Sequence, residues 1–196
     1  RLGLSDAEIA AFKVSLFCYP DAPVAELFAA WQGGGERIVC LVPEGVAAQA
    51  VQAFLGTEAR AGAAATHGAL TVRVLPFVPQ PDYDRLLWAC DLNFVRGEDS
   101  WVRAQWAGKP FVWHIYPQDE NLHHKKLRAF LERYAPDIDS VQAVMLQFNG
   151  AAPDAAGTGP ARHGRPHPPC RRVGAAVDRA GDGVAGRARR PATHRA

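Results

Sequence analysis

The sequence predicts an α/β domain of the Rossmann-like class, in which a parallel sheet carries helices on both faces. The first observation is that short apolar runs of strand length alternate with longer stretches whose apolar residues recur at helical spacing. The second is that these short runs are continuously apolar, which is typical of parallel strands covered on both sides. No GxGxxG pattern follows the first predicted strand, so a dinucleotide cofactor is disfavoured.

The individual elements follow from apolar periodicity and from the glycines and prolines between them. Residues 57–68 are small and polar, and they predict a surface loop. In the helix predicted at 121–134, the inward face is expected to carry Leu122, Leu127, Phe130 and Leu131. Four tryptophans are also spaced like core residues: Trp88, Trp101, Trp106 and Trp113. Strands are predicted at 14–19, 37–42, 70–75, 92–95 and 111–115, and helices at 23–32, 46–55, 83–89, 101–107, 121–134 and 139–148.

Length and composition limit the class of protein. A chain of 196 residues allows one or two domains. No stretch approaches the ~18 apolar residues of a membrane span and no secretory signal is visible, so we expect no membrane association. Four widely separated cysteines are typical of reduced thiols in a cytoplasmic protein. Because the chain starts at Arg1 and its only methionine is Met145, we expect an interior piece of a longer protein.

The composition changes abruptly near residue 150, so we expect a folded domain at 1–150 and a separate basic tail at 151–196. The tail holds nine arginines and three aspartates, a net charge of +6, which leaves −4 on residues 1–150. Its Ala-, Gly-, Pro- and Arg-rich sequence buries too little apolar area to offset the entropy of ordering. Two interpretations stay open, out-of-frame translation and a disordered tail that contacts RNA. The negative charge of 1–150 argues against nucleic-acid binding by the folded part.

The polar segment 96–100, between a predicted strand and a predicted helix, is where chemistry is expected. In an open parallel sheet, ligands bind beyond the carboxyl ends of the strands, where helix N-termini present free N–H groups. Arg96, Gly97 and such amides suit a diphosphate, with Asp99 or Ser100 as N-cap. Two acids are unexpected beside an anion. Asp99 is explained by capping as readily as by function, whereas Glu98 is not needed as a cap and points to catalysis.

Three other segments end at the same predicted edge. Tyr19 closes the first strand, where it either faces the crevice or covers the sheet edge. Phe77, held between two prolines, either stacks on a base or plugs the edge of the domain. Gln80 either reads the polar edge of a pyrimidine or caps the next helix. Gln118 follows the last strand and is expected to touch a ligand.

The histidines do not predict a metal site. His114 lies within a predicted strand, where a lone histidine is more often a satisfied core residue than a base. The run 123–126, His-His-Lys-Lys, resembles a metal or anion cluster, but adjacent residues point to different faces of a helix. We therefore interpret 123–126 as a solvated surface and expect no metal.

The stretches 74–80, 83–88 and 92–118 together resemble the C-terminal half of the bacterial arginine rhamnosyltransferases that modify elongation factor P, the EarP family. The resemblance runs from about Val14 to about Gly150, and the run Phe94–Trp106 is its most specific part. It implies the C-terminal nucleotide-sugar domain of a GT-B glycosyltransferase. It further implies an inverting transfer of rhamnose from TDP-β-L-rhamnose to an arginine guanidinium of translation elongation factor P, without a metal.

The resemblance also implies roles for the candidate residues. Glu98 would be the carboxylate of the catalytic site in this half, and it would either orient the acceptor guanidinium or stabilise oxocarbenium character. The other candidates would bind the donor: Phe77 and Gln80 the thymine with Tyr19 nearby, and Arg96, Gly97 and the turn amides of Asp99 and Ser100 the diphosphate, with Gln118 at the crevice.

The chain departs from the family pattern at both ends. We expect the N-terminal acceptor domain to be absent and the basic tail to stand in place of the C-terminal helices, so we expect the chain alone to bind the donor weakly if at all and not to turn over. The residues themselves leave other functions open: a non-catalytic nucleotide-, RNA- or protein-binding module, or a transferase for another nucleotide sugar.

Overall fold

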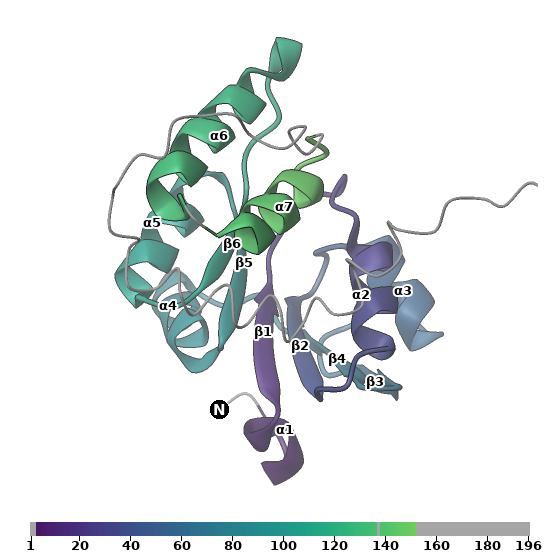
Figure 1. Ribbon diagram of the computed structural model, residues 1–196. Coiled ribbons are helices and arrows are strands. Elements are labelled where there is room, and N and C mark those ends of the chain that lie inside the picture. The colour runs from purple at the N-terminus through teal and green to yellow at the C-terminus, as the bar shows by residue number, and fades with distance from the viewer. Residues whose placement is uncertain (1–2, 137, 152–196) are drawn as a thin grey trace, which may run out of the picture.

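A sheet of six strands forms the centre of the computed structural model, which describes residues 3–136 and 138–151 (Figure 1). The strands lie in the order β3-β4-β2-β1-β5-β6. All neighbours pair in parallel except β3 and β4, which are antiparallel. Their bounds are β1 Phe12–Leu16, β2 Ile38–Pro43, β3 Ala64–His67, β4 Leu70–Leu75, β5 Leu92–Arg96 and β6 Phe111–His114. Strands β2 and β4 lie on one side of β1, whereas β5 and β6, which come later in the chain, lie on its other side. The boundary between β1 and β5 is therefore a topological switch point.

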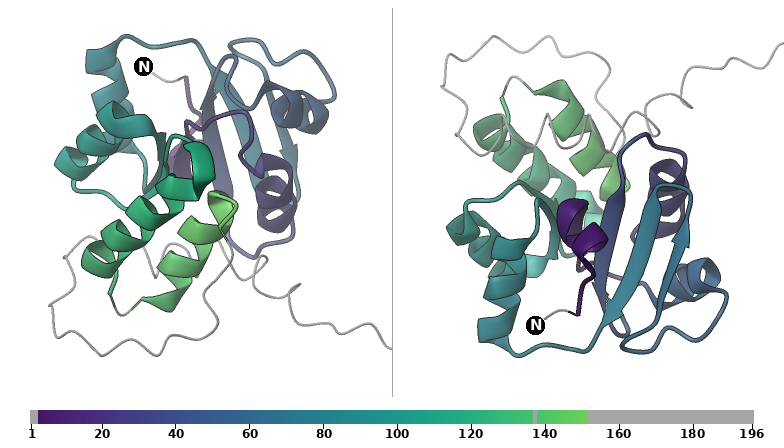
Figure 2. Two further views of the ribbon diagram at one scale, coloured as in Figure 1. Left: turned by 90° about the horizontal axis from the view of Figure 1, so that it is seen from above. Right: turned by 90° about the horizontal axis from the view of Figure 1, so that it is seen from below.

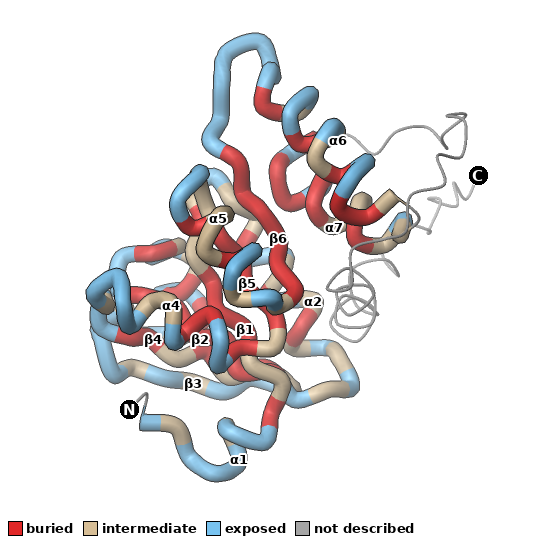
Figure 3. Tube along the Cα trace, turned by 90° about the vertical axis from the view of Figure 1, so that its left-hand side faces the viewer, coloured by how far each residue is buried: buried red, intermediate tan, exposed pale blue. Residues whose placement is uncertain are grey.

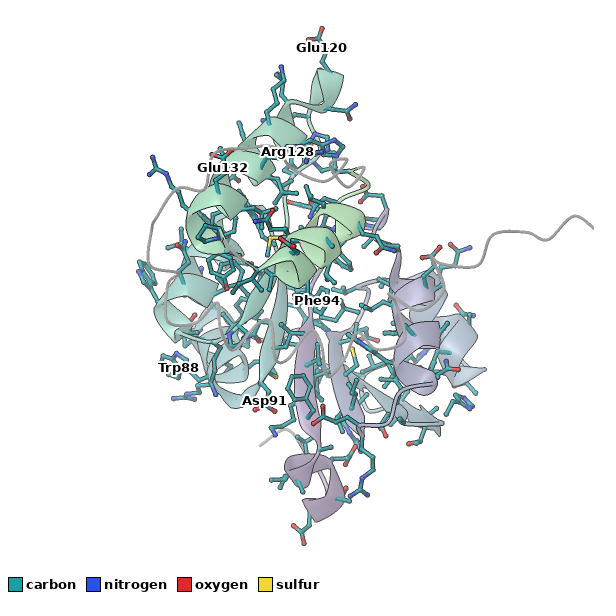
Figure 4. All side chains as sticks on the ribbon, viewed as in Figure 1. Trp88, Asp91, Phe94, Glu120, Arg128 and Glu132 are labelled. Carbon is teal, nitrogen blue, oxygen red and sulfur yellow. The ribbon has the colours of Figure 1, made fainter. Side chains whose placement is uncertain are left out.

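Helices cover both faces, as the sequence predicts (Figure 2). Their bounds are α1 Asp6–Ala10, α2 Val24–Gln32, α3 Ala48–Leu55, α4 Gln80–Ala89, α5 Gly97–Ala107, α6 Leu122–Tyr134 and α7 Asp139–Phe148, with a 3₁₀ turn, η1, at Asp119–Asn121. Helices α2, α3 and α7 cover one face, where Phe94 packs at 5.8 Å from Trp31 and 4.8 Å from Phe148, measured between ring centroids (Figure 4). On the other face Val39 and Leu41 of β2 pack with Leu86 of α4 and with Ala11, the residue that follows α1.

The edge strand β6 is closed by a side chain rather than by another strand. Asn149, at the end of α7, accepts from the Ile115 N–H at 2.9 Å and donates to the Trp113 carbonyl at 2.8 Å. The amide therefore satisfies the outward-facing backbone of β6 in place of a neighbouring strand. It also fixes α7 on the sheet, next to the carboxyl end of β6.

The predicted surface loop 57–68 is wrong in part, because Ala64–His67 forms β3. This strand pairs with β4 through a tight turn at Gly68 (φ +58°), and the Thr66 and Thr71 hydroxyls lie 2.9 Å apart across the pair. As a mostly exposed edge strand, β3 needs no apolar run (Figure 3). The apolar periodicity that revealed the other strands was therefore missing here.

The expectation of four buried tryptophans is also only half right. Trp113 is buried and stacks on Trp101 at 4.8 Å between ring centroids. Trp106, in contrast, is 77% exposed. Trp88 is 57% exposed (Figure 4). Trp101 and Trp106 are five residues apart on α5, a rotation of about 140°, so they cannot share one face of the helix. Leu122, expected to face inward, is 45% exposed because it begins α6 beyond the sheet.

The remaining expectations have mixed outcomes. His114 is a buried strand residue with a hydrogen-bond partner, as predicted, and Cys18, Cys40 and Cys90 are buried and free. His123 was wrongly assigned to a solvated surface. It is buried, and its Nδ1 lies 3.1 Å from the Gln118 backbone nitrogen. In the described part of the chain no helix has the length and apolar character to cross a membrane. The predicted tail lies, from residue 152 on, outside the described residues.

Candidate functional site

The candidate site lies at the edge of the sheet where β1, β4, β5 and β6 end. Parallel strands place their carboxyl ends at the same edge, so the segments that follow these strands come together there. These segments carry all of the predicted site residues: Tyr19, Phe77, Gln80, Arg96, Gly97, Glu98, Asp99, Ser100 and Gln118. The β1/β5 switch point brings Tyr19 next to Arg96.

Arg96, the last residue of β5, is held between two rings. Its Cζ atom lies 4.2 Å from the ring centroid of Phe17 and 5.1 Å from that of Tyr19, within the range of a cation–π contact. Its Nη1 donates to the Cys18 carbonyl at 3.1 Å. Among the described residues no carboxylate lies within the 4.0 Å of an ion pair with Arg96. The guanidinium is thus held in place while its charge stays uncompensated.

Helix α5 begins directly after Arg96, four residues earlier than predicted. Arg96 itself stands at the N-cap position and no side chain caps the helix, so the expectation that Asp99 or Ser100 is the N-cap is wrong. Both residues lie in the first turn instead. The first backbone N–H groups of a helix have no partner within it and carry partial positive charge. The start of α5 therefore adds donors to the charge of Arg96.

Gly97 allows this direct passage from strand to helix. Its φ is +62°, a conformation that other residues rarely adopt, and a Cβ atom here would lie 2.9 Å from the Tyr19 hydroxyl. The Trp113 indole N–H donates to the Gly97 carbonyl at 2.8 Å and fixes the turn from the side of β6. The close approach of Tyr19 to Gly97 and the Trp113 hydrogen bond bring together the carboxyl ends of β1, β5 and β6.

The two acids of the first turn differ in their surroundings. Asp99 Oδ2 accepts from Gln80 Nε2 at 3.2 Å and from Arg103 Nε at 3.1 Å. Glu98 is exposed, and within the described residues it has no hydrogen bond or ion pair. Asp99 is thus compensated, and Glu98 is the acid left unpaired next to Arg96.

Tyr19 lies beyond β1 rather than at its end, because the strand stops at Leu16 instead of continuing to residue 19. Its backbone N–H donates to His114 Nδ1 at 3.1 Å, and its ring lies 5.2 Å from that of His114 and 5.6 Å from that of Tyr116. Burial lowers the pKa of His114 to about 4, so the imidazole is neutral at pH 7 and accepts this bond. His114 therefore holds the segment that carries Tyr19.

The structure leaves two predicted residues away from this group. Phe77 is 74% exposed and makes no ring contact with a described residue, so it does not plug the edge of the domain. Gln118 is exposed, and its backbone nitrogen and carbonyl oxygen lie 3.1 and 3.2 Å from His123 Nδ1. Ser100 is buried in the first turn of α5. Gln80 begins α4 and joins the group through Asp99.

Sequence reasoning missed two residues of this group, Phe17 and Arg103. Phe17 lay inside a predicted strand, and nothing in its pattern indicates that its ring supports Arg96. Arg103 carried a readable signal, because it follows Asp99 by four residues and such pairs meet on a helix. That signal was hidden because the helix was predicted to start only at residue 101.

Sheet order and site together define an α/β domain with a polar edge beyond the carboxyl ends of its parallel strands, which is where such domains bind ligands. The chain belongs to the EarP family: the family model for elongation-factor P (EF-P) rhamnosyltransferase EarP matches residues 1–163.

Relatives and a solved structure agree with this assignment. The chain is 48% identical over 138 residues to a protein-arginine rhamnosyltransferase of Pseudomonas putida, covering 69% of this chain and 37% of the relative. The corresponding enzyme of Pseudomonas aeruginosa is 46% identical over 135 residues, covering 68% and 36%. The chain thus spans little more than a third of the length of these curated relatives. A solved structure from work on EarP-mediated arginine glycosylation of translation elongation factor EF-P matches with a TM-score of 0.63 and 34% identity, covering 96% of this chain and 58% of that one.

Proposed function

We propose that this chain is the donor-binding half of a protein-arginine rhamnosyltransferase. The donor is TDP-β-L-rhamnose, and the acceptor is an arginine guanidinium of translation elongation factor P, which places the reaction in the cytoplasm. Membership of the EarP family supports the reaction and the acceptor. The observation that carries the donor-binding role is the uncompensated guanidinium of Arg96 at the uncapped start of α5.

The diphosphate would lie between Arg96 and the first amides of α5. When the glycosidic bond breaks, negative charge grows on the departing TDP, and fixed donors at that position stabilise the charge without reorganising. A guanidinium and several helix N–H groups can supply this stabilisation without a divalent metal ion. Gly97 allows the backbone to pass from strand to helix directly after Arg96, and its position opposite the Tyr19 hydroxyl leaves no room for a side chain.

The thymine base would stack on Phe77. This ring is 74% exposed on the segment between Pro76 and Pro79, which restricts its backbone. Gln80 follows at the start of α4, and its Nε2 group is engaged by Asp99. Its amide oxygen remains to accept the N3–H of thymine, while Tyr19 closes the site from the β1 side and Gln118 from the β6 side.

Glu98 is the residue proposed to act at the reacting carbon. An exposed, unpaired carboxylate beside an anion site weakens binding of the anion, so it is best explained by the reaction. Near the anomeric carbon the carboxylate either orients the incoming guanidinium or stabilises oxocarbenium character. Inversion follows when the acceptor attacks from the side opposite to the departing TDP. In the family the acceptor surface belongs to another domain, so we expect this chain alone to bind the donor weakly at best and not to transfer rhamnose.

Calorimetric titration of the 196-residue chain with TDP, UDP and TDP-rhamnose tests the proposal. Selective binding of the TDP ligands is expected, together with a loss of affinity in both Phe77→Ala and Arg96→Ala. Trp106→Ala and Arg85→Ala are the matched controls, because they remove an exposed aromatic ring and an exposed guanidinium away from the site. Equal binding of TDP and UDP would refute the thymine assignment. Transfer of rhamnose to elongation factor P by the chain alone would refute the division of roles.

A further inference from the structure

A network of polar side chains joins the N-terminal turns of α4 and α5. Arg103 lies at its centre, with Nη1 2.9 Å from both carboxylate oxygens of Asp84 on α4. Its Nε donates to Asp99 Oδ2 at 3.1 Å, and the same oxygen accepts from Gln80. The side chain of Arg103 is only 17% exposed, whereas that of Asp99 is 73% exposed. The guanidinium is thus fixed by α4 and turned toward the acid of the first turn of α5.

This contact resolves a conflict within the proposed donor site. The amides at the start of α5 favour an anion, but the Asp99 carboxylate in the same turn repels one. Arg103, one turn further along α5, supplies the opposite charge at that carboxylate. Glu98 has no such partner among the described residues. Of the two neighbouring acids, Asp99 has a cation paired with it, whereas Glu98, which the reaction is proposed to use, has no ion pair among the described residues.

We propose that Arg103 is a positioning residue of the donor site. It neutralises the Asp99 carboxylate so that the helix start accepts a diphosphate, and through Asp99 and Asp84 it holds Gln80 at a fixed distance from that turn. The inference rests on the proposed function of the site. It assigns Arg103 no contact with the ligand.

The test is a double-mutant cycle read by titration with TDP. Arg103→Gln is expected to weaken TDP binding roughly three- to tenfold, because it leaves the Asp99 carboxylate without its cation near the diphosphate. The effect is modest because solvent and salt screen this exposed charge. Adding Asp99→Asn to this variant removes the charge, and TDP affinity is expected to return to within about twofold of wild type. The deficit of the single variant should also shrink as the salt concentration rises.

Two further variants separate charge from structure. Arg103→Lys keeps the positive charge and loses the planar guanidinium. If Arg103 acts through its charge, this variant should retain most of the affinity for TDP. If Arg103 acts only by joining α4 to α5, Arg103→Lys should weaken TDP binding as much as Arg103→Gln does. Arg85→Gln is the matched control. It breaks an exposed arginine–aspartate pair on α4, with 2.8 Å between Arg85 Nη1 and Asp82 Oδ1, and should leave TDP binding unchanged.

The outcomes also distinguish this inference from the proposed function. If wild type binds TDP and Arg103→Gln binds it equally well, the inference is wrong and the donor site stands. If Arg103→Gln is impaired but Asp99→Asn does not restore binding, Arg103 acts by direct contact or by folding, and charge compensation is refuted. If the folded wild-type chain does not bind TDP, the donor site is refuted and the role of Arg103 falls with it.

Discussion

Replacing His114 should change how the stability of the protein depends on pH. The imidazole is 2% exposed, and burial lowers its pKa from 6.5 to about 4. The pKa is also lowered by the nearby Arg96 charge and raised by Asp21, whose Oδ1 lies 3.8 Å from His114 Nε2. Nδ1 already accepts the Tyr19 N–H, so a second proton would have to displace that bond.

The sign follows from comparing the folded and unfolded states. Between pH 6.5 and pH 4 the unfolded chain binds a proton at this residue and the folded chain does not, so acid favours unfolding. The contribution of neutral His114 is complete above pH 6.5, and it is lost as the pH falls through this range toward 4. A difference of this size corresponds to about 3 kcal/mol of unfolding free energy at most.

Urea denaturation of wild type and His114→Gln at several pH values between 7.5 and 4.5 measures this effect. The variant is expected to start less stable at neutral pH and to lose less stability on acidification, so the two curves approach each other by about 2 kcal/mol. His67→Gln, which replaces an exposed histidine of β3, controls for the removal of a histidine as such. Parallel curves for wild type and His114→Gln would refute a buried, neutral His114 as a source of acid sensitivity.

Two substitutions elsewhere test the supports of the site. Asn149→Ala leaves the Ile115 N–H and the Trp113 carbonyl without their side-chain partner, so the unfolding free energy should fall by about 2–4 kcal/mol in urea titration. Gln147→Ala, exposed on the same helix, should change it little. Gly97→Ala should cost about 1–2 kcal/mol for its left-handed backbone and should also weaken TDP binding by displacing Tyr19. If calorimetric titration shows that Gly97→Ala binds TDP as tightly as wild type, Tyr19 does not contribute to the donor site.

The order of strands and helices could be predicted because buried parallel strands leave a strong apolar signal. The helix 139–148 was predicted with its observed bounds, since Val141, Met145 and Phe148 form a clear buried stripe. The signal fails where burial is not required. Strand β3 satisfies its backbone by pairing with β4 while most of its side chains stay exposed, so its composition is that of a loop.

The candidate site was predictable in its position and less so in its contacts. Tyr19, Arg96 and Gly97 were chosen because they follow strands, and the structure brings all three into contact. The start of α5 was predicted too late because a glycine between a strand and polar residues is typical of a turn. In the structure Gly97 adopts a positive φ and is the first residue of the helix. That error hid the relation between Asp99 and Arg103.

The contrast between the two acids of the first turn of α5 bears on mechanism. A carboxylate beside an anion site must either be compensated or serve the reaction, because its repulsion otherwise weakens binding. Asp99 is compensated by two donors from α4 and α5, at 3.2 and 3.1 Å. Glu98, one residue earlier, has no partner among the described residues and is exposed. Since both sit in the same turn, general features of the helix start cannot explain the difference. We therefore infer that the charge of Glu98 is retained for the acceptor guanidinium or the reacting sugar.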